Sequence, residues 1–251
     1  MNRKNRSTEK LVLEFEDRRE IKNLMAKYIT ALMLNRDADL FEQFWSMQED
    51  VCIAFNDGWY LGKDAVAGYY QALGKKLRLI AKLLQKRFPE QLGDKSFEEL
   101  YGIGPFEAKP VTNPYVVVAN DRNTARGVWM VQGADTEVGI YGPLSYWTWG
   151  VYACDFIQED GAWKLLHMQY LEDIRHIMGQ NWSEPEQMPP ELPEFAALKN
   201  FRLPAYTVSM ENRAYYTPDR PFAPLPKLPV PYETMDPANS YGFREEAGAN
   251  A

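Results

Sequence analysis

The chain has 251 residues, of which 45% are hydrophobic and 25% are charged, the proportions of an ordinary globular protein. Its formal net charge of −7 argues against nucleic acid as a partner, because phosphate binding requires a concentrated basic surface. Aromatic residues make up 14%, which suits a lined cavity or a large interface better than a minimal core.

The N-terminal segment and the cysteines bear on the compartment in which the chain works. The first part of the sequence has no apolar segment typical of an export signal, and no apolar run approaches the roughly 20 residues that a membrane span requires. Cys52 and Cys154 lie in apolar, strand-like runs, where buried free thiols are expected and a disulfide is the alternative. We therefore expect a cytoplasmic protein that does not contact a membrane.

The first part of the chain predicts two helices, a hairpin and a long helix. Apolar residues recur at helical spacing over residues 17–34, and a second, short helix is expected at 40–45. Residues 51–55 and 59–61 are predicted to form two strands joined by an Asn-Asp-Gly turn. A helix rich in alanine, leucine and lysine follows over residues 64–88, until a proline stops it.

The middle of the chain predicts a meander of strands. Four segments are rich in aromatic and β-branched residues, at 115–119, 125–132, 146–158 and 163–170. Asn-Asp-Arg-Asn and Asp-Gly sequences supply turns after the first and the third of these segments. Helices followed by a meander are typical of an α+β fold, in which helices pack on one face of a curved antiparallel sheet.

A C-terminal extension over residues 183–251 differs in composition from the rest of the chain. It is rich in proline, which suits a disordered linker. Its many aromatic residues, such as Phe195, Tyr206, Tyr215 and Tyr241, contradict that composition. We therefore expect an ordered strap that packs on the domain or on a neighbouring subunit, with simple disorder as the alternative.

Two pairs of segments resemble a known family. They are residues 28–41 with 50–62, and residues 123–129 with 152–165. In their order and spacing these segments resemble the SnoaL-like branch of the nuclear transport factor 2-like superfamily. The resemblance covers about residues 15–178, which we predict to be one pocket domain.

The resemblance implies a cone-shaped fold, in which a strongly bent sheet wraps a long helix and leaves an apolar cavity open at one end. Members include dehydratases, isomerases, epoxide hydrolases, polyketide cyclases, cofactor-independent aryl-diol lyases and non-catalytic binding modules, so the fold alone does not fix the reaction. Within the family, residues 160–164 followed by 173–175 are especially similar to scytalone dehydratase.

Several common chemistries find no support in the sequence. The histidines, His167 and His176, do not have the spacing of a metal motif. No Gly-x-Ser-x-Gly elbow is present, and Cys154 has no evident base beside it. A Gly-x-Gly-x-x-Gly sequence is also missing, so neither a metal nor a nucleotide cofactor is predicted. Acid–base chemistry in an apolar pocket remains, where poor solvation shifts pKa values and strengthens hydrogen bonds.

Three residues are candidates for catalysis. Tyr60 follows the first strand, where family members often have a pocket residue; the alternative is a cavity-wall aromatic. Tyr152 aligns with a polar substrate-binding position of scytalone dehydratase, and its alternative is a packed strand tyrosine. Met168 aligns with a pocket-lining position, so strict strand alternation would turn His167 away from the cavity. We retain His167 as a candidate base because twist and bulges can break this alternation.

Two departures from scytalone dehydratase affect the predicted substrate. Met33 and Leu34 stand where that family has a Tyr-Asp pair, and its catalytic histidine pair has no counterpart around Asn113 and Asp135. Dehydration by that mechanism is therefore not expected, and the apolar replacements favour a larger aromatic or polycyclic substrate. The predicted substrate-binding residues are Phe55, Trp59, Trp129, Met33, Asn113 and Met168. Plain core packing is the alternative for the apolar ones, and for Met33 it is the stronger interpretation.

Taken together, these features predict a cofactor-independent lyase that acts on an aromatic or polycyclic alcohol. A base would take a proton, Tyr60 and Tyr152 would stabilise an oxyanion, and the substrate would lose water or a one-carbon fragment such as formaldehyde. The alternatives are an isomerase or cyclase, which loses no fragment, and a non-catalytic binding or assembly protein. A homo-oligomer, dimer or trimer, is expected because a bent sheet leaves its convex face apolar.

Overall fold

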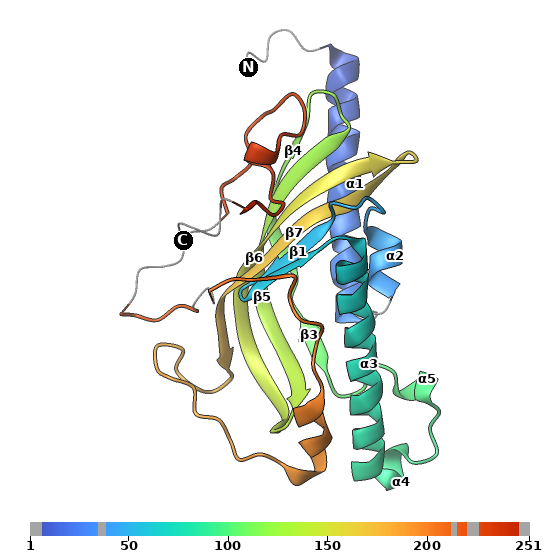
Figure 1. The fold of residues 1–251 in the computed structure, drawn as a ribbon, viewed down its shortest axis with the longest axis vertical. Coiled ribbons are helices and arrows are strands. Elements are labelled where there is room, and N and C mark those ends of the chain that lie inside the picture. Colours follow the sequence, from blue (N-terminus) through green and yellow to red (C-terminus); the bar gives the residue numbers. More distant parts are fainter. Residues whose placement is uncertain (1–6, 35–38, 212–214, 220–225, 246–251) are drawn as a thin grey trace.

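The computed structural model describes residues 7–34, 39–211, 215–219 and 226–245. It consists of a strongly bent sheet with two long helices along one side (Figure 1). Within these ranges, no helix combines the length and the apolar character needed to cross a membrane.

The first long helix, α1, spans Thr8–Met33. It begins at Ser7, whose side chain accepts a hydrogen bond from the Lys10 N–H at 3.2 Å, the usual role of serine at a helix N-terminus. Ile21 and Met25 are spaced four residues apart on its buried face. The first turns of α1 extend past the end of the sheet (Figure 1), so the second half of the helix carries the packing.

A short helix, a hairpin and the second long helix follow α1. The elements are α2 (Leu40–Phe44), β1 (Cys52–Phe55), β2 (Gly58–Leu61), α3 (Lys63–Arg87), α4 (Pro89–Leu92) and α5 (Phe97–Leu100). Helix α3 ends just before Pro89, because proline disfavours helical backbone at the preceding residue. Helix α1 begins at Thr8, nine residues before its predicted start at residue 17, and the short helices α4 and α5 were not predicted. Helices α2 and α3 and the hairpin agree with the predicted segments to within a few residues.

Long strands form the rest of the sheet. They are β3 (Phe106–Ala108), β4 (Val111–Val118), β5 (Thr124–Gly139), β6 (Gly142–Glu159), β7 (Ala162–Ile177) and the short β8 (Val208–Ser209). The strand order is β3-β5-β6-β7-β1-β2-β8, and β4 pairs with another part of β5. Strand β1 joins β7 in parallel, whereas the other named strand pairs are antiparallel. Strand β5 continues to Gly139, beyond its predicted end at residue 132.

The main core lies between the sheet and the helices. Alternate side chains of β6, including Tyr152, Cys154 and Phe156, are buried in one cluster with Met25 and Tyr28 of α1. The intervening side chains of β6 point to the outer face of the sheet. The prediction of an α+β fold with a curved antiparallel sheet is confirmed (Figure 1).

The described parts of the extension pack on the same chain. Residues Pro193–Asn200 form a 3-10 helix, η3, whose Phe195 packs in a cluster with Ile80 of α3. Strand β8 then pairs with β2. Farther on, a short 3-10 helix, η4 (Pro237–Asn239), precedes Tyr241, which is buried on the outer face of the sheet. The extension therefore reaches both the helix side and the outer face of the domain.

Candidate active site

A cavity of about 270 Å³ lies between the helix-facing side of the sheet and the helices α1 and α3. Its lining residues come from both helices and from β1, β3, β5, β6 and β7. An apolar cavity of about 150 Å³ can hold benzene. The volume therefore suits a molecule with one or two rings, which narrows the predicted range of aromatic or polycyclic ligands.

Aromatic side chains form much of the cavity wall. Tyr152 of β6 and Tyr170 of β7 are cross-strand partners whose stacked rings have centroids 4.5 Å apart. Tyr28 of α1 packs edge-on against Tyr152 at 6.5 Å. Phe55 of β1 and Tyr69 of α3 lie 5.0 Å apart between their ring centroids. These rings give the cavity flat apolar surfaces against which an aromatic ligand can pack.

Two phenols meet at one side of the cavity. The hydroxyl oxygens of Tyr28 and Tyr70 are 2.8 Å apart, and the indole N–H of Trp45 donates to the Tyr70 oxygen at 3.2 Å. Burial, followed by the neighbouring Tyr70, raises the pKa of Tyr28 well above its ordinary value. Tyr28 therefore stays protonated at neutral pH. When Tyr70 donates to Tyr28, the Tyr28 O–H can point to a ligand oxygen.

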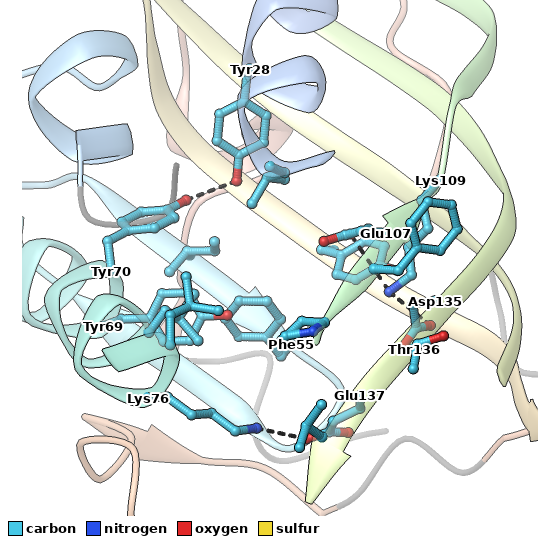
Figure 2. Close-up of a pocket in the computed structure, with 18 of the residues that line it drawn as sticks. Tyr28, Phe55, Tyr69, Tyr70, Lys76, Glu107, Lys109, Asp135, Thr136 and Glu137 are labelled. Carbon is cyan, nitrogen blue, oxygen red and sulfur yellow. Dashed lines mark hydrogen bonds and ion pairs between the residues drawn. The ribbon is translucent and has the colours of Figure 1, made fainter. Parts of the chain in front are cut away.

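Charged side chains lie across the cavity from these phenols (Figure 2). Glu107 is the middle residue of β3, and Lys109 directly follows that strand. The Lys109 Nζ lies 3.2 Å from Asp135 Oδ1 and 3.7 Å from Glu107 Oε1. Lower in Figure 2, Lys76 of α3 reaches Glu137 of β5, with 2.7 Å between Nζ and Oε1.

A further layer of charge supports this wall. The Arg175 Nη2 lies 3.2 Å from Asp135 Oδ2 and 3.0 Å from Glu137 Oε2. The Tyr170 hydroxyl donates to Glu172 Oε1 at 2.9 Å. We call the whole set the charged network: Lys76, Lys109, Arg175, Glu107, Asp135, Glu137 and Glu172.

The surroundings of Glu107 and Lys109 raise the pKa of both side chains. Burial raises the pKa of Glu107, although the adjacent Lys109 opposes this shift. Burial acts to lower the pKa of Lys109, but the carboxylates of Glu107, Asp135 and Glu172 outweigh it, so this pKa is raised. Lys109 thus remains a cation, whereas Glu107 is a more basic carboxylate than usual and can accept a proton.

Three of the predicted site residues line the cavity. Phe55, Tyr152 and Met168 are all among its walls. Burial raises the pKa of Tyr152 well above its ordinary value, so that its phenol also stays protonated. The position of Met168 agrees with the pocket-lining role that its alignment with scytalone dehydratase implied.

Tyr60 lies behind the cavity wall. Its hydroxyl donates to the Pro204 carbonyl at 2.8 Å, and its ring packs against Tyr206 with centroids 4.8 Å apart. Both partners belong to the extension, which occupies the position that a substrate oxygen would need. Tyr60 is absent from the cavity lining among the described residues.

The other predicted binding residues are also separate from the cavity. Trp59 faces the outer side of the sheet, where its ring meets Phe243 at 5.6 Å. Trp129 is buried and packs edge-on against Phe156. Met33 is 37% exposed at the end of α1. Asn113 is exposed and has φ 50° at an irregularity of β4, which turns it away from regular strand pairing.

His167 lies on the outer face of the sheet, as strict strand alternation predicts. A register shift does occur next to it, between the Asp155 and Phe156 pairings, but it does not turn His167 into the cavity. Instead, His167 Nδ1 lies 2.9 Å from Asp155 Oδ2, and its Nε2 lies 3.8 Å from Asp50 Oδ2. His167 is therefore not positioned to act as a base in the cavity.

His167 belongs to a buried set that holds the extension, here called the outer cluster: Arg126, Asp155, His167, Ser240 and Tyr241. The fully buried Asp155 Oδ2 accepts from the Ser240 hydroxyl at 2.6 Å and from the Tyr241 backbone N–H at 2.7 Å. Arg126 Nε lies 3.3 Å from Asp155 Oδ1, and its guanidinium covers the Tyr241 ring at 4.4 Å. Burial acts to lower the pKa of His167, but hydrogen bonds to Asp155 and Asp50 raise it to about 9.

Sequence reasoning missed the phenol pair and the charged network. The sequence pattern places Tyr28 on an apolar helix face, whose members usually form plain core. Asp135 and Glu137 lie beyond the predicted end of β5, although their alternation with Thr136 and Val138 was a signal for a longer strand. Over the described ranges, no group of three or more His, Cys, Asp or Glu side chains has an arrangement that could hold a metal ion.

A family model covers most of the predicted pocket domain and ends before the extension. The family model of the SnoaL-like domain matches residues 13–169. A search of curated proteins finds no match to the sequence.

Several solved structures are similar to this chain. A point variant of Rv3472 from Mycobacterium tuberculosis, a protein of unknown function, is 15% identical with a TM-score of 0.45, over 76% of this chain and 89% of its own. A protein from Novosphingobium aromaticivorans, provisionally named a scytalone dehydratase, is 16% identical with a TM-score of 0.45, over 71% and 97%. Hexachlorocyclohexane dehydrochlorinase LinA-type3 from Novosphingobium barchaimii is 14% identical with a TM-score of 0.43, over 70% and 97%. Because the SnoaL-like model matches more than half of the sequence, the chain belongs to the SnoaL-like domain family.

Proposed function

We propose that this protein is a cofactor-independent lyase that acts on an aromatic alcohol of one or two rings in the cavity. One observation carries the proposal. The cavity has a buried phenol pair on one side and the basic carboxylate of Glu107 on the other, with aromatic walls between them (Figure 2). This arrangement supplies a base and hydrogen-bond donors, which are the groups that an elimination needs.

For loss of water, Glu107 takes a proton from carbon. The C–H electron pair forms the double bond while the neighbouring C–O bond breaks. Glu107 returns the proton to the departing hydroxide, so water leaves and the carboxylate is restored. The Tyr28–Tyr70 pair donates a hydrogen bond to the departing oxygen.

For loss of formaldehyde from an aryl diol, Glu107 takes the proton of the terminal hydroxyl instead. The C–C bond breaks, formaldehyde leaves, and the electron pair remains on the carbon beside the ring. That carbon then takes the proton back from Glu107. Both reactions balance without an oxidant, a reductant or a cofactor.

Product mass and two variants test the proposal. The full chain is incubated with monoaryl and diaryl alcohols and diols, and the products are analysed by mass spectrometry for loss of water or formaldehyde. We expect Glu107→Gln to lower the rate by about 10² to 10⁴-fold, and Tyr28→Phe to lower it by about 10²-fold. Glu49→Gln is the matched control, because Glu49 is exposed and pairs with Lys63 at the surface.

Each alternative function gives a different result in the same assay. A product of unchanged mass with a displaced proton would identify an isomerase or cyclase. Binding without turnover of any alcohol would identify a non-catalytic binding protein. Full activity in Glu107→Gln would exclude Glu107 as the base, even if a lyase activity were found.

A further inference from the structure

The charged network has an excess of carboxylates. Its cations are Lys76, Lys109 and Arg175, and four carboxylates face them. Arg175 is shared by two carboxylates, and Lys109 is shared by three. Each cation already has an anionic partner within 3.2 Å, so none is available to an incoming anion without breaking a pair.

Among the carboxylates that line the cavity, Glu107 is the one with the weakest ion pairing. Asp135 pairs with Lys109 at 3.2 Å and also accepts from Arg175 and from the Thr148 hydroxyl. In the described part of the chain, Glu107 and Glu172 each have Lys109 as their only ion-pair partner, at 3.7 and 3.8 Å. Glu172 also accepts a hydrogen bond from the Tyr170 hydroxyl at 2.9 Å and is not among the cavity-lining residues, whereas Glu107 is. The excess negative charge of the cavity is therefore concentrated at Glu107.

The aromatic walls, like Glu107, favour a positively charged ligand. The face of an aromatic ring carries partial negative charge and attracts cations. The Lys109 ammonium already lies 6.0 Å from the centre of the Tyr170 ring. Tyr170 stacks on Tyr152, and burial raises the pKa of both phenols, a shift to which the nearby charge of Glu107 contributes. A cationic or neutral group is thus compatible with both the rings and the network, whereas a carboxylate is repelled by both.

We infer that the cavity selects its ligands by charge, with Glu107 as the determinant: it binds aromatic ammonium and aromatic alcohol compounds and excludes aromatic carboxylates. The inference rests on the proposed function in one respect, that this cavity is the substrate site. It does not depend on the reaction. For the lyase, it means that the substrate is an aromatic alcohol without a carboxylate group, and that aromatic amines act as competitive inhibitors.

Three small phenols of matched shape test this inference by binding alone. Tyramine, tyrosol and 4-hydroxyphenylacetate share a phenol ring and a two-carbon side chain, and at pH 7 they are cationic, neutral and anionic. Calorimetric titration of the full chain should give the affinity order tyramine, tyrosol, 4-hydroxyphenylacetate. We expect at least about a tenfold difference in Kd between the first and the last, because opposed like charges in a desolvated site are strongly unfavourable.

The Glu107→Gln variant identifies the determinant. The variant removes one negative charge, so the ratio of the affinity for tyramine to the affinity for 4-hydroxyphenylacetate should fall by about tenfold. The Glu49→Gln control should keep the affinity ratio of the unaltered chain. Equal or tighter binding of the carboxylate would overturn the inference, as would an unchanged ratio in Glu107→Gln or no binding of tyramine and tyrosol. Charge-selective binding without turnover of any alcohol would defeat the lyase proposal and leave this inference standing.

Discussion

Two polar clusters occupy opposite faces of the same two strands. On the helix side, Tyr152 of β6 faces Tyr170 of β7 and lies near Glu107. On the outer side, Asp155 of β6 faces His167 of β7 and lies beneath the extension. Strand alternation separates the two clusters, although each contains a basic group next to a carboxylate.

The clusters differ in how completely their polar groups are satisfied. Asp155 accepts hydrogen bonds from the side chains of His167 and Ser240 and from the Tyr241 N–H, and it pairs with Arg126. Glu107 shares one lysine with two other carboxylates and borders a cavity. A fully satisfied cluster stabilises structure, whereas a weakly compensated group beside a cavity can bind or react. We therefore interpret the outer cluster as the anchor of the extension.

The largest effect on stability is expected from Asp155→Asn. This change removes the charge that Arg126 and His167 share inside the protein, which should lower the free energy of unfolding by about 3–5 kcal/mol. Urea unfolding measures it, with Asp94→Asn as the matched control because Asp94 is exposed. If Asp155→Asn were as stable as the control, the outer cluster would not contribute to the stability of the fold.

The next effect concerns pH. The pKa of His167 is about 9 in the folded chain, above the ordinary value of about 6.5 that an unfolded chain would show. Its stabilising contribution is therefore complete below about pH 6.5 and is lost as the pH rises through 9, by up to about 3 kcal/mol. Urea unfolding between pH 6 and pH 10 measures this loss, which His167→Gln should lack; identical profiles for both proteins would contradict it.

The smallest effect is expected from Tyr60→Phe. Its hydroxyl bonds only to the Pro204 carbonyl among the hydrogen bonds found in the described residues, so its removal should cost about 1 kcal/mol of stability. Because Tyr60 does not line the cavity, kcat should stay unchanged while Tyr28→Phe lowers it. A large loss of kcat in Tyr60→Phe, measured with the same alcohol, would contradict this expectation and would indicate that the active site lies near Tyr60 on β2.

Local patterns were sufficient to predict most of the fold. Helical spacing identified the buried face of α1 around Ile21 and Met25, and a proline marked the end of α3. Alternation along β7 indicated that His167 faces away from the cavity once the family resemblance had placed Met168 inside it, and keeping His167 as a candidate base against this pattern was wrong. These features depend on neighbouring residues in the chain, which a sequence displays directly.

The site itself depends on contacts between distant segments. The phenol pair joins residues 42 positions apart, and the outer cluster joins Asp155 to Ser240, 85 positions away. Composition does not show where the extension lies, so the prediction placed the Tyr60 hydroxyl in the pocket rather than against the extension. The network at Glu107 and Lys109 was missed because a short strand before a proline resembles a loop.

The most direct test of this account is a structure of the full chain with tyrosol bound. We predict that the phenol ring lies against Tyr152 and Tyr170, with one ligand oxygen about 2.5–3.0 Å from the hydroxyl oxygen of Tyr28 or Tyr70 and the ligand's side chain toward Glu107. A ligand held at the outer cluster beside His167, with the cavity left empty, would contradict the account.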